Sequence, residues 1–305
     1  MHPDLPPPSA VLAGGLRWRV QRTGPPASAS APTLLLLHGT GSSLLSWQGC
    51  LPALAAQFQL VVPDLPGHGG TDAFADRSAS LPRMAQAVGA LLRALGLSPA
   101  LAAGHSAGAA VMVQLALDGG LPAARGLLAV NGALEPLPGL MGLVAPAVAR
   151  MASRSVLLPD WVTRHAAQPR ALGHLIASTG SRLDDAGVAH YRDLLRQPDH
   201  VRGVLDMLAV TDFPDIRRKA AIQSSTEGNI LLIPREGGYL VRLYVDLGDV
   251  APDNREAALR LIPIYTAATS SAWRASTPDS AMRPPGFTFD ASIDAISFKI
   301  GRAHV

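Results

Sequence analysis

A serine set between two glycines constrains this chain more than any other feature. The segment reads Gly104-His105-Ser106-Ala107-Gly108, which is G-x-S-x-G. A short apolar run precedes it and a helical pattern follows it. In such a strand–turn–helix context the turn is sharp, the glycines avoid collisions, and the serine hydroxyl is exposed at a helix N-terminus. The sequence therefore predicts a nucleophilic serine at 106.

Strand and helix signals alternate on both sides of this turn. Short apolar runs without polar breaks predict strands that are buried on both faces. Serine caps and glycine stops bound the helical stretches between them. This alternation predicts an open parallel sheet with helices on both faces. The expected strands are 16–20, 33–37, 59–64, 101–104 and 126–131, and the expected helices are 42–58, 80–95 and 107–117.

The pattern changes twice along the chain. Residues 1–132 form the predicted sheet-and-helix core, although 1–12 are Pro-rich and expected to be loose. Residues 133–208 read as a helical cap over the strand ends. Beyond them, 209–265 contain a predicted hairpin of two strands, 229–234 and 239–247, and 266–305 form an irregular tail without clear periodicity.

A glycine-rich loop follows the strand at 33–37 and reads His38-Gly39-Thr40-Gly41. Acyl transfer needs donors that stabilise the oxyanion of the tetrahedral intermediate. We expect the backbone N–H groups of Thr40 and Ala107 to be these donors. In the following Asp64–Gly69 segment, Asp64 and His68 are expected to fix the turn rather than to catalyse.

The composition limits the partners of the chain. Hydrophobic residues make up 48% and charged residues 16%, which suits a large buried core. The net charge is only +3 and the basic residues are scattered, so nucleic-acid binding is not expected. The single cysteine, Cys50, allows no internal disulfide, and no run of 18 apolar residues occurs. Residues 1–15 lack a basic start and a long apolar stretch, so they are not expected to act as a signal peptide. We expect a cytoplasmic protein without metal or cofactor.

The motifs together resemble a known family. LLLLHGTGSSLLSW, PDLPGHG and the serine turn are typical of α/β-hydrolases, and NGALEPLPGL and STGSRLD resemble the magnesium chelatase accessory proteins of bacteriochlorophyll synthesis. The resemblance covers about residues 10–208. It implies an α/β-hydrolase fold with serine ester hydrolysis as family chemistry, and a link to magnesium insertion into protoporphyrin IX. The apolar stretch 137–149 would then face a tetrapyrrole, a small apolar substrate or a membrane edge.

The remainder of the chain resembles other sequences. Residues 211–248 are similar to the middle of phenol-2-monooxygenase-type flavoproteins, in which the residues matching Arg235 and Tyr244 lie near the flavin and substrate. No G-x-G-x-x-G dinucleotide site accompanies this fragment. Residues 300–305 read like the translated start of a sequencing adapter. We therefore expect a chimeric reading frame that lacks the C-terminal part of the hydrolase fold.

A serine hydrolase also needs a histidine base and an acid to orient it, in the chain order serine, acid, histidine. No suitable histidine turn follows residue 209. Neither Glu135 nor the later acids Asp249 and Asp253 has an evident base to orient. The other histidines are expected to have surface or structural roles, or to lie in the suspect tail: His165, His174, His190, His200 and His304.

Three functions remain open from the sequence. The first is an ester hydrolase of the accessory-protein family, with its activity impaired by the missing base. The second is a non-catalytic protein that binds a tetrapyrrole under the cap. The third is a fragment of a flavin-dependent aromatic hydroxylase, which ranks last because its dinucleotide site is absent.

Overall fold

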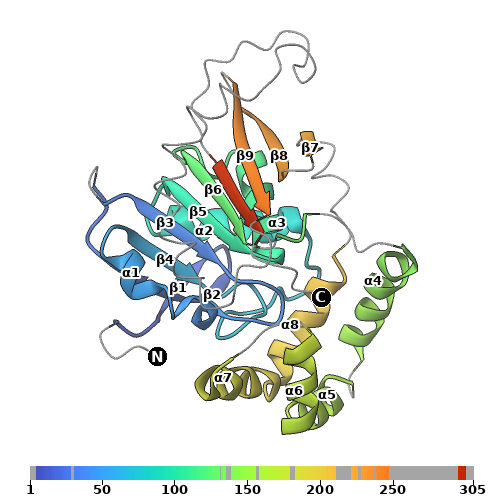
Figure 1. Ribbon diagram of the computed structural model, residues 1–305. Helices are drawn as coiled ribbons and strands as arrows, with labels where there is room; N and C mark the ends of the chain where they lie inside the picture. Colours follow the sequence, from blue (N-terminus) through green and yellow to red (C-terminus); the bar gives the residue numbers. More distant parts are fainter. Residues whose placement is uncertain are drawn as a thin grey trace.

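A computed structural model of the chain describes most of the first 210 residues (Figure 1). The described ranges are 5–28, 31–130, 132–134, 139–155, 158–178 and 183–210. Beyond them the structure describes the backbone of four strands, at 221–225, 228–235, 238–246 and 295–299.

One mixed sheet organises the molecule, with strand order β1-β2-β4-β3-β5-β6-β10-β9-β8-β7. Strands β3, β4, β5 and β6 are mutually parallel, as predicted, and β2 joins β4 in the antiparallel sense. The register pairs Leu37 at the end of β3 with Gly104 on β5, so both strands end at the same edge. The bounds of the strands up to β6 are β1 Ser9–Ala13, β2 Leu16–Thr23, β3 Thr33–Leu37, β4 Gln59–Pro63, β5 Leu101–His105 and β6 Gly126–Val130.

Helices cover both faces of these strands. The side chains of β3 divide between two apolar clusters, because successive residues of a strand point to opposite faces. Leu35 and Leu37 pack with the cluster that includes α2 (Leu81–Ala94) and α3 (Ala107–Leu117). Leu34 and Leu36 pack with the cluster that includes residues of the 3₁₀ helix η1 (Leu44–Trp47) and of α1 (Leu51–Ala55). The unbroken leucine run is therefore buried on both sides, as the sequence predicts.

Two expectations for the first 60 residues were wrong. The predicted helix 42–58 is split into η1 and α1, with Gly49 in the break and Pro52 in the first turn of α1. Glycine weakens a helix interior, and proline is accepted mainly in the first turn. Residues expected to be loose form β1, which pairs antiparallel with β2 from Ser9↔Val20 to Ala13↔Leu16.

Among the described residues, five helices occupy the cap region. They are α4 Gly139–Arg154, α5 Leu158–Ala166, α6 Pro169–Ser178, α7 Asp185–Leu195 and α8 Pro198–Leu208. In Figure 1 they gather at one end of the core strands, with α8 next to the core. The contact is close, since a Cβ added to Gly203 of α8 would lie 1.9 Å from the Gly67 carbonyl oxygen. An ion pair of 2.8 Å between Arg77 and Asp206 lies on the same seam.

The later strands extend the sheet beyond β6. The predicted hairpin is confirmed: β8 (Gly228–Arg235) and β9 (Gly238–Asp246) pair antiparallel, and β7 (Ala221–Ser225) pairs with β8. The expectation of an irregular tail was wrong at β10 (Ala295–Lys299), which lies parallel to both β6 and β9. Its Ile296 and Phe298 alternate with polar residues, and β10 covers the side of β6 that would otherwise be an open sheet edge. The other residues of 266–305 lie outside the described part.

No helix in the described ranges combines the length and the apolar character that a bilayer crossing requires.

The close contact between Gly203 of α8 and the Gly67 carbonyl predicts that a larger residue at 203 destabilises the fold. Gly203→Ala forces a methyl group against a backbone carbonyl, and we expect it to lower the free energy of unfolding by about 1–3 kcal/mol. Gly173→Ala is the matched control, because a Cβ at that α6 position meets nothing within 4 Å. It should be neutral or stabilise the protein by up to about 1 kcal/mol. Urea unfolding of both variants measures the difference, and equal effects would contradict the close contact.

Candidate active site

Ser106 lies between β5 and α3 with φ 50° and ψ −120°, a backbone conformation that few residues other than glycine adopt. Such strain persists only where the surroundings hold it in place. The Ser106 N–H donates to the Val130 carbonyl at 3.0 Å, and the Ser106 carbonyl accepts from Ala109 and Ala133, each at 3.0 Å. These bonds fix the turn between β5, β6 and α3, so the serine lies at the strand–helix junction, as predicted.

The two flanking glycines make this turn sterically feasible. A Cβ on Gly104 would lie 2.6 Å from backbone atoms of Gly108 and Ala109. One on Gly108 would lie 2.3 Å from the His38 carbonyl oxygen and 2.6 Å from that of Leu37. A side chain at 104 would collide with the start of α3, and one at 108 would collide with the end of β3. The elbow role predicted for Gly104 and Gly108 is therefore a steric requirement of this structure.

The loop after β3 contacts the serine turn directly. A Cβ on Gly39 would lie 3.0 Å from Ser106 Cβ and 2.9 Å from His105 Nδ1. Within the described ranges, the Thr40 and Ala107 N–H groups make no hydrogen bond. Among the described residues these two amides are unengaged: one begins α3 directly after Ser106, and the other follows Gly39, which contacts Ser106. Their assignment to an oxyanion hole stays a prediction.

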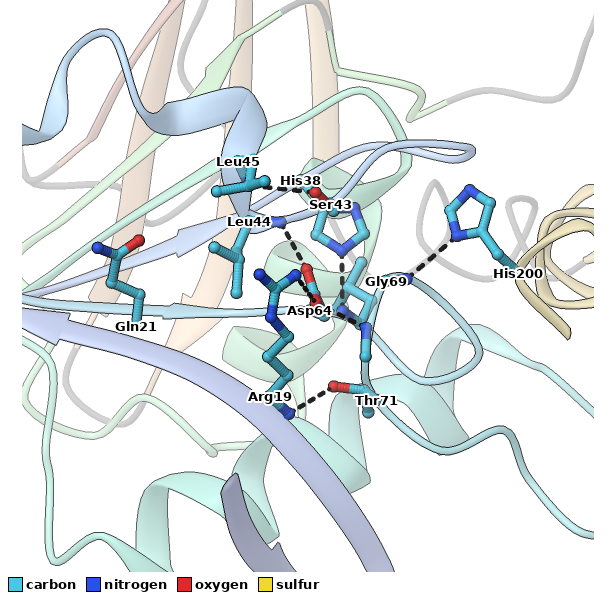
Figure 2. A network of polar contacts seen from close by, with 12 residues as sticks. Arg19, Gln21, His38, Ser43, Leu44, Leu45, Asp64, Gly69, Thr71 and His200 are labelled. Carbon is cyan, nitrogen blue, oxygen red and sulfur yellow. Dashed lines mark hydrogen bonds and ion pairs between the residues drawn. The ribbon is translucent and has the colours of Figure 1, made fainter. Parts of the chain in front are cut away.

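Asp64 holds the surrounding loops together (Figure 2). Its carboxylate is fully buried and accepts hydrogen bonds from Leu44 N–H at 2.6 Å and Gly70 N–H at 2.9 Å. The Arg19 guanidinium on β2 adds an ion pair of 3.2 Å. Burial raises the pKa of the carboxyl group, whereas the two N–H donors and Arg19 lower it. Asp64 therefore fixes the turn, as expected, and joins the loops after β3 and β4 to β2.

His38 has a defined tautomer at the end of β3. Its Nδ1–H donates to the Gly39 carbonyl at 2.8 Å, and its Nε2 accepts from Leu65 N–H at 2.8 Å. Burial lowers the pKa of this imidazole to about 3. Both nitrogens are occupied by backbone groups, so His38 supports the Gly39 loop and is not available as a base.

Two more buried histidines continue from His38 into the cap. The ring centroids of His38 and His68 are 5.4 Å apart, and those of His68 and His200 are 5.3 Å apart. His200 of α8 accepts a hydrogen bond from Gly69 N–H at 3.1 Å, as Figure 2 shows. Burial lowers the pKa of both His68 and His200 to about 3. A row of neutral imidazoles therefore fills the seam between core and cap.

Helix α7 is hydrogen-bonded to the loop that follows Gly41. Tyr191 Oη lies 3.0 Å from Ser42 Oγ, and His190 Nε2 lies 2.9 Å from Ser43 Oγ. Burial lowers the pKa of His190. The cap residues His190, Tyr191 and His200 were not predicted as part of this region. A polar residue on the face of a helix that packs on the core would have indicated such a role. Periodicity alone does not tell which face of a cap helix meets the core.

No described side chain hydrogen-bonds to the Ser106 hydroxyl. Among the cap histidines, His165 and His174 are exposed, and His165 donates to or accepts from the Trp161 carbonyl at 2.8 Å on its own helix. Glu135, Asp249, Asp253 and His304 lie outside the described residues. In the described part of the chain, the serine turn and the two amides are present, and the serine hydroxyl has no side-chain hydrogen-bond partner.

Within the same part, no three His, Cys, Asp or Glu side chains are placed to hold a metal ion together.

Comparisons with known proteins support the same fold. Residues 32–136 match the α/β hydrolase fold family, which spans the predicted oxyanion loop, the elbow and β6. A solved structure from Pseudomonas aeruginosa, classed with the epoxide hydrolases, superposes with a TM-score of 0.60 at 18% identity, covering 100% of this chain and 90% of its own. At that identity the likeness shows the fold alone. The chain belongs to the α/β-hydrolase family.

Within that family, the chain is similar to the magnesium-chelatase 30 kDa subunit of Rhodobacter capsulatus. The two are 41% identical over 196 residues, which is 64% of this chain and 67% of that protein. The chain thus spans about two thirds of the relative's length. A separate segment of 56 residues is 61% identical to the 3-hydroxybenzoate 4-monooxygenase of Comamonas testosteroni, but covers only 9% of that enzyme. Both predicted resemblances are confirmed.

The buried imidazoles predict an acid-sensitive fold. In the unfolded chain His38, His68 and His200 titrate near 6.5, whereas in the folded protein their pKa values are about 3. Between these values the unfolded state binds more protons, so stability is complete above pH 6.5 and falls as the pH decreases towards 3. Each histidine should contribute a slope of up to about 1.4 kcal/mol per pH unit in that window. Urea unfolding at a series of pH values measures the slope.

Two glutamine variants test the source of that slope. His200→Gln removes one buried imidazole, so its stability should fall less steeply between pH 6.5 and 3. His174→Gln removes an exposed histidine of α6 and should keep the slope of the unmodified chain. Identical slopes in both variants would show that the core–cap seam does not control the acid response.

Proposed function

We propose that this chain is a hydrolase-fold partner of magnesium chelation, whose Ser106 site holds an ester or acyl group but hydrolyses it poorly. The observation that carries the proposal is the Ser106 turn, strained at φ 50° beside two unengaged amides and without a histidine partner in the described residues. The link to magnesium chelation comes from the relative in Rhodobacter capsulatus, which is named a magnesium-chelatase subunit.

The chemistry of the site follows from what is present. A carbonyl oxygen placed between the Thr40 and Ala107 amides would be polarised, because donors in a protein interior stabilise developing negative charge better than water does. The Ser106 hydroxyl would lie beside that carbonyl. A serine hydroxyl is a weak nucleophile at neutral pH unless a base removes its proton. Binding and polarisation are therefore retained in this proposal, whereas nucleophilic attack is slow.

The rate of ester hydrolysis tests whether the site binds a carbonyl group but attacks it slowly. Loss of the base in a serine protease costs roughly 10⁶-fold in turnover, while donors and binding alone keep roughly 10³–10⁴-fold over water. We expect p-nitrophenyl acetate hydrolysis barely above background, and Ser106→Ala should change the rate little. Rapid hydrolysis that is lost in Ser106→Ala would overturn the proposal. It would mean that a base reaches Ser106, either His190 or a residue outside the described ranges.

A non-catalytic binding role is the second candidate. The same lack of a base favours it, because a site without turnover can still hold a ligand. It predicts that protoporphyrin IX binds with a saturable change in its absorbance spectrum. The binding should persist in Ser106→Ala, since the hydroxyl contributes little to contacts with a large apolar ring. Unsaturable, non-specific uptake would count against this role.

A flavin-dependent hydroxylase is the candidate function with the least support. Its segment covers 9% of the relative's length, and the chain contains no dinucleotide-binding turn. A flavin hydroxylase would be purified with a yellow cofactor, and the present proposal expects a colourless protein.

A further inference from the structure

The exposed positions of α4 carry larger apolar side chains than its buried positions do. The buried positions of this helix include Ala149, Ala152 and Ser153, which are small. Val144, Val148 and Met151 are exposed by 44%, 50% and 71% of their surface. Their spacing of i, i+4 and i+7 places them on one side of the helix. A helix that buries small residues and exposes large apolar ones has an outer face suited to a further contact.

The neighbouring cap helices continue this pattern. Trp161 on α5 is 56% exposed and Leu175 on α6 is 49% exposed. By comparison, only two other large apolar side chains are strongly exposed in the described residues, Leu12 on β1 and Leu208 on α8. In Figure 1, α5 and α6 lie beyond α8 as seen from the core strands, and α4 lies to the right of them. The exposed apolar side chains therefore concentrate on three consecutive helices, which we call the α4–α6 surface.

Charge indicates what such a surface contacts. Residues 139–178 contain four arginines, no lysine and a single acid, Asp160, giving a net charge of +3 with neutral histidines. The arginines Arg150, Arg154, Arg164 and Arg170 are all exposed, and none forms an ion pair with a described side chain. Arg150 also donates to the Ala209 carbonyl at 3.2 Å. The same helices thus combine positive charge with exposed Val, Met, Trp and Leu.

We propose that the α4–α6 surface docks on a bilayer that contains anionic lipid headgroups. Apolar side chains would enter the boundary between headgroups and acyl chains, and the arginines would contact the headgroup phosphates. Tryptophan favours this boundary because its ring is apolar and its N–H is polar. Each arginine near an anionic surface strengthens binding about fivefold, an effect that salt weakens. The docked protein lies on the surface and does not cross it.

This surface differs from the Ser106 site, so its test is independent of ester chemistry. The full-length chain is mixed with vesicles of equal parts phosphatidylglycerol and phosphatidylcholine and separated by flotation. We expect the chain to float with these vesicles, and to be released by high salt. Vesicles of phosphatidylcholine alone should retain much less of it.

Matched aspartate variants locate the contact. Val148→Asp combined with Met151→Asp should lower the partition coefficient at least about tenfold, because it removes apolar contacts and adds negative charge. Leu12→Asp is the control: its side chain is 79% exposed on β1 at the other end of the core, so it adds a charge without altering the α4–α6 surface. The control should float like the unmodified chain.

Three outcomes would overturn the proposal. One is failure of the unmodified chain to float with anionic vesicles. Another is an equal loss of binding in Leu12→Asp and in the α4 double variant. The third is a dimer in light scattering that the α4 double variant abolishes, because a second copy would then occupy the surface instead of lipid.

Discussion

The contact between the end of β3 and the start of α3 determines how the rest of the site is built. Gly108 lies so close to the Leu37 and His38 carbonyls that no side chain fits between them. Gly104 packs equally closely on the same helix start. The turn that joins β5 to α3 is therefore tight, and Ser106 in this turn has a positive φ. The serine hydroxyl and the loop that carries Thr40 are adjacent for the same reason.

A second layer keeps that loop in place and connects it to the cap. Asp64 joins the loops after β3 and β4, and His38 bonds to backbone groups in both. His200 of α8 bonds to Gly69 beside Asp64. The position of the cap over the serine edge is therefore coupled to the same buried polar groups that hold the oxyanion loop. Burial keeps the imidazoles of this seam neutral, which makes it sensitive to protonation.

Much of the core was predictable because local signals and the global fold agree there. The Ser80 cap and the Gly96 stop bound α2, and the leucine run of β3 is buried on both faces as its composition indicates. The serine turn was predictable because its two glycines have a steric function that leaves a sequence pattern.

Other parts depend on contacts that the sequence does not display. His190, Tyr191 and His200 gain their roles from how α7 and α8 sit on the core, which no periodicity specifies. The strand at 295–299 was missed because it forms by pairing with the distant edges of β6 and β9. The lack of a base is predicted because the resemblance to α/β-hydrolases ends near residue 209, before the segment that carries the histidine in that family. Within the described residues, the Ser106 hydroxyl has no histidine partner.

The central claim is that the elbow is intact while the base is absent. The most direct test is the pH dependence of the rate at which a fluorophosphonate modifies Ser106, with Ser106→Ala as the blank. Without a base, the rate should be slow at neutral pH and rise steadily with hydroxide concentration. A rate that is fast at neutral pH and levels off above a pKa typical of histidine would contradict the account, because it would reveal a working base beside the serine.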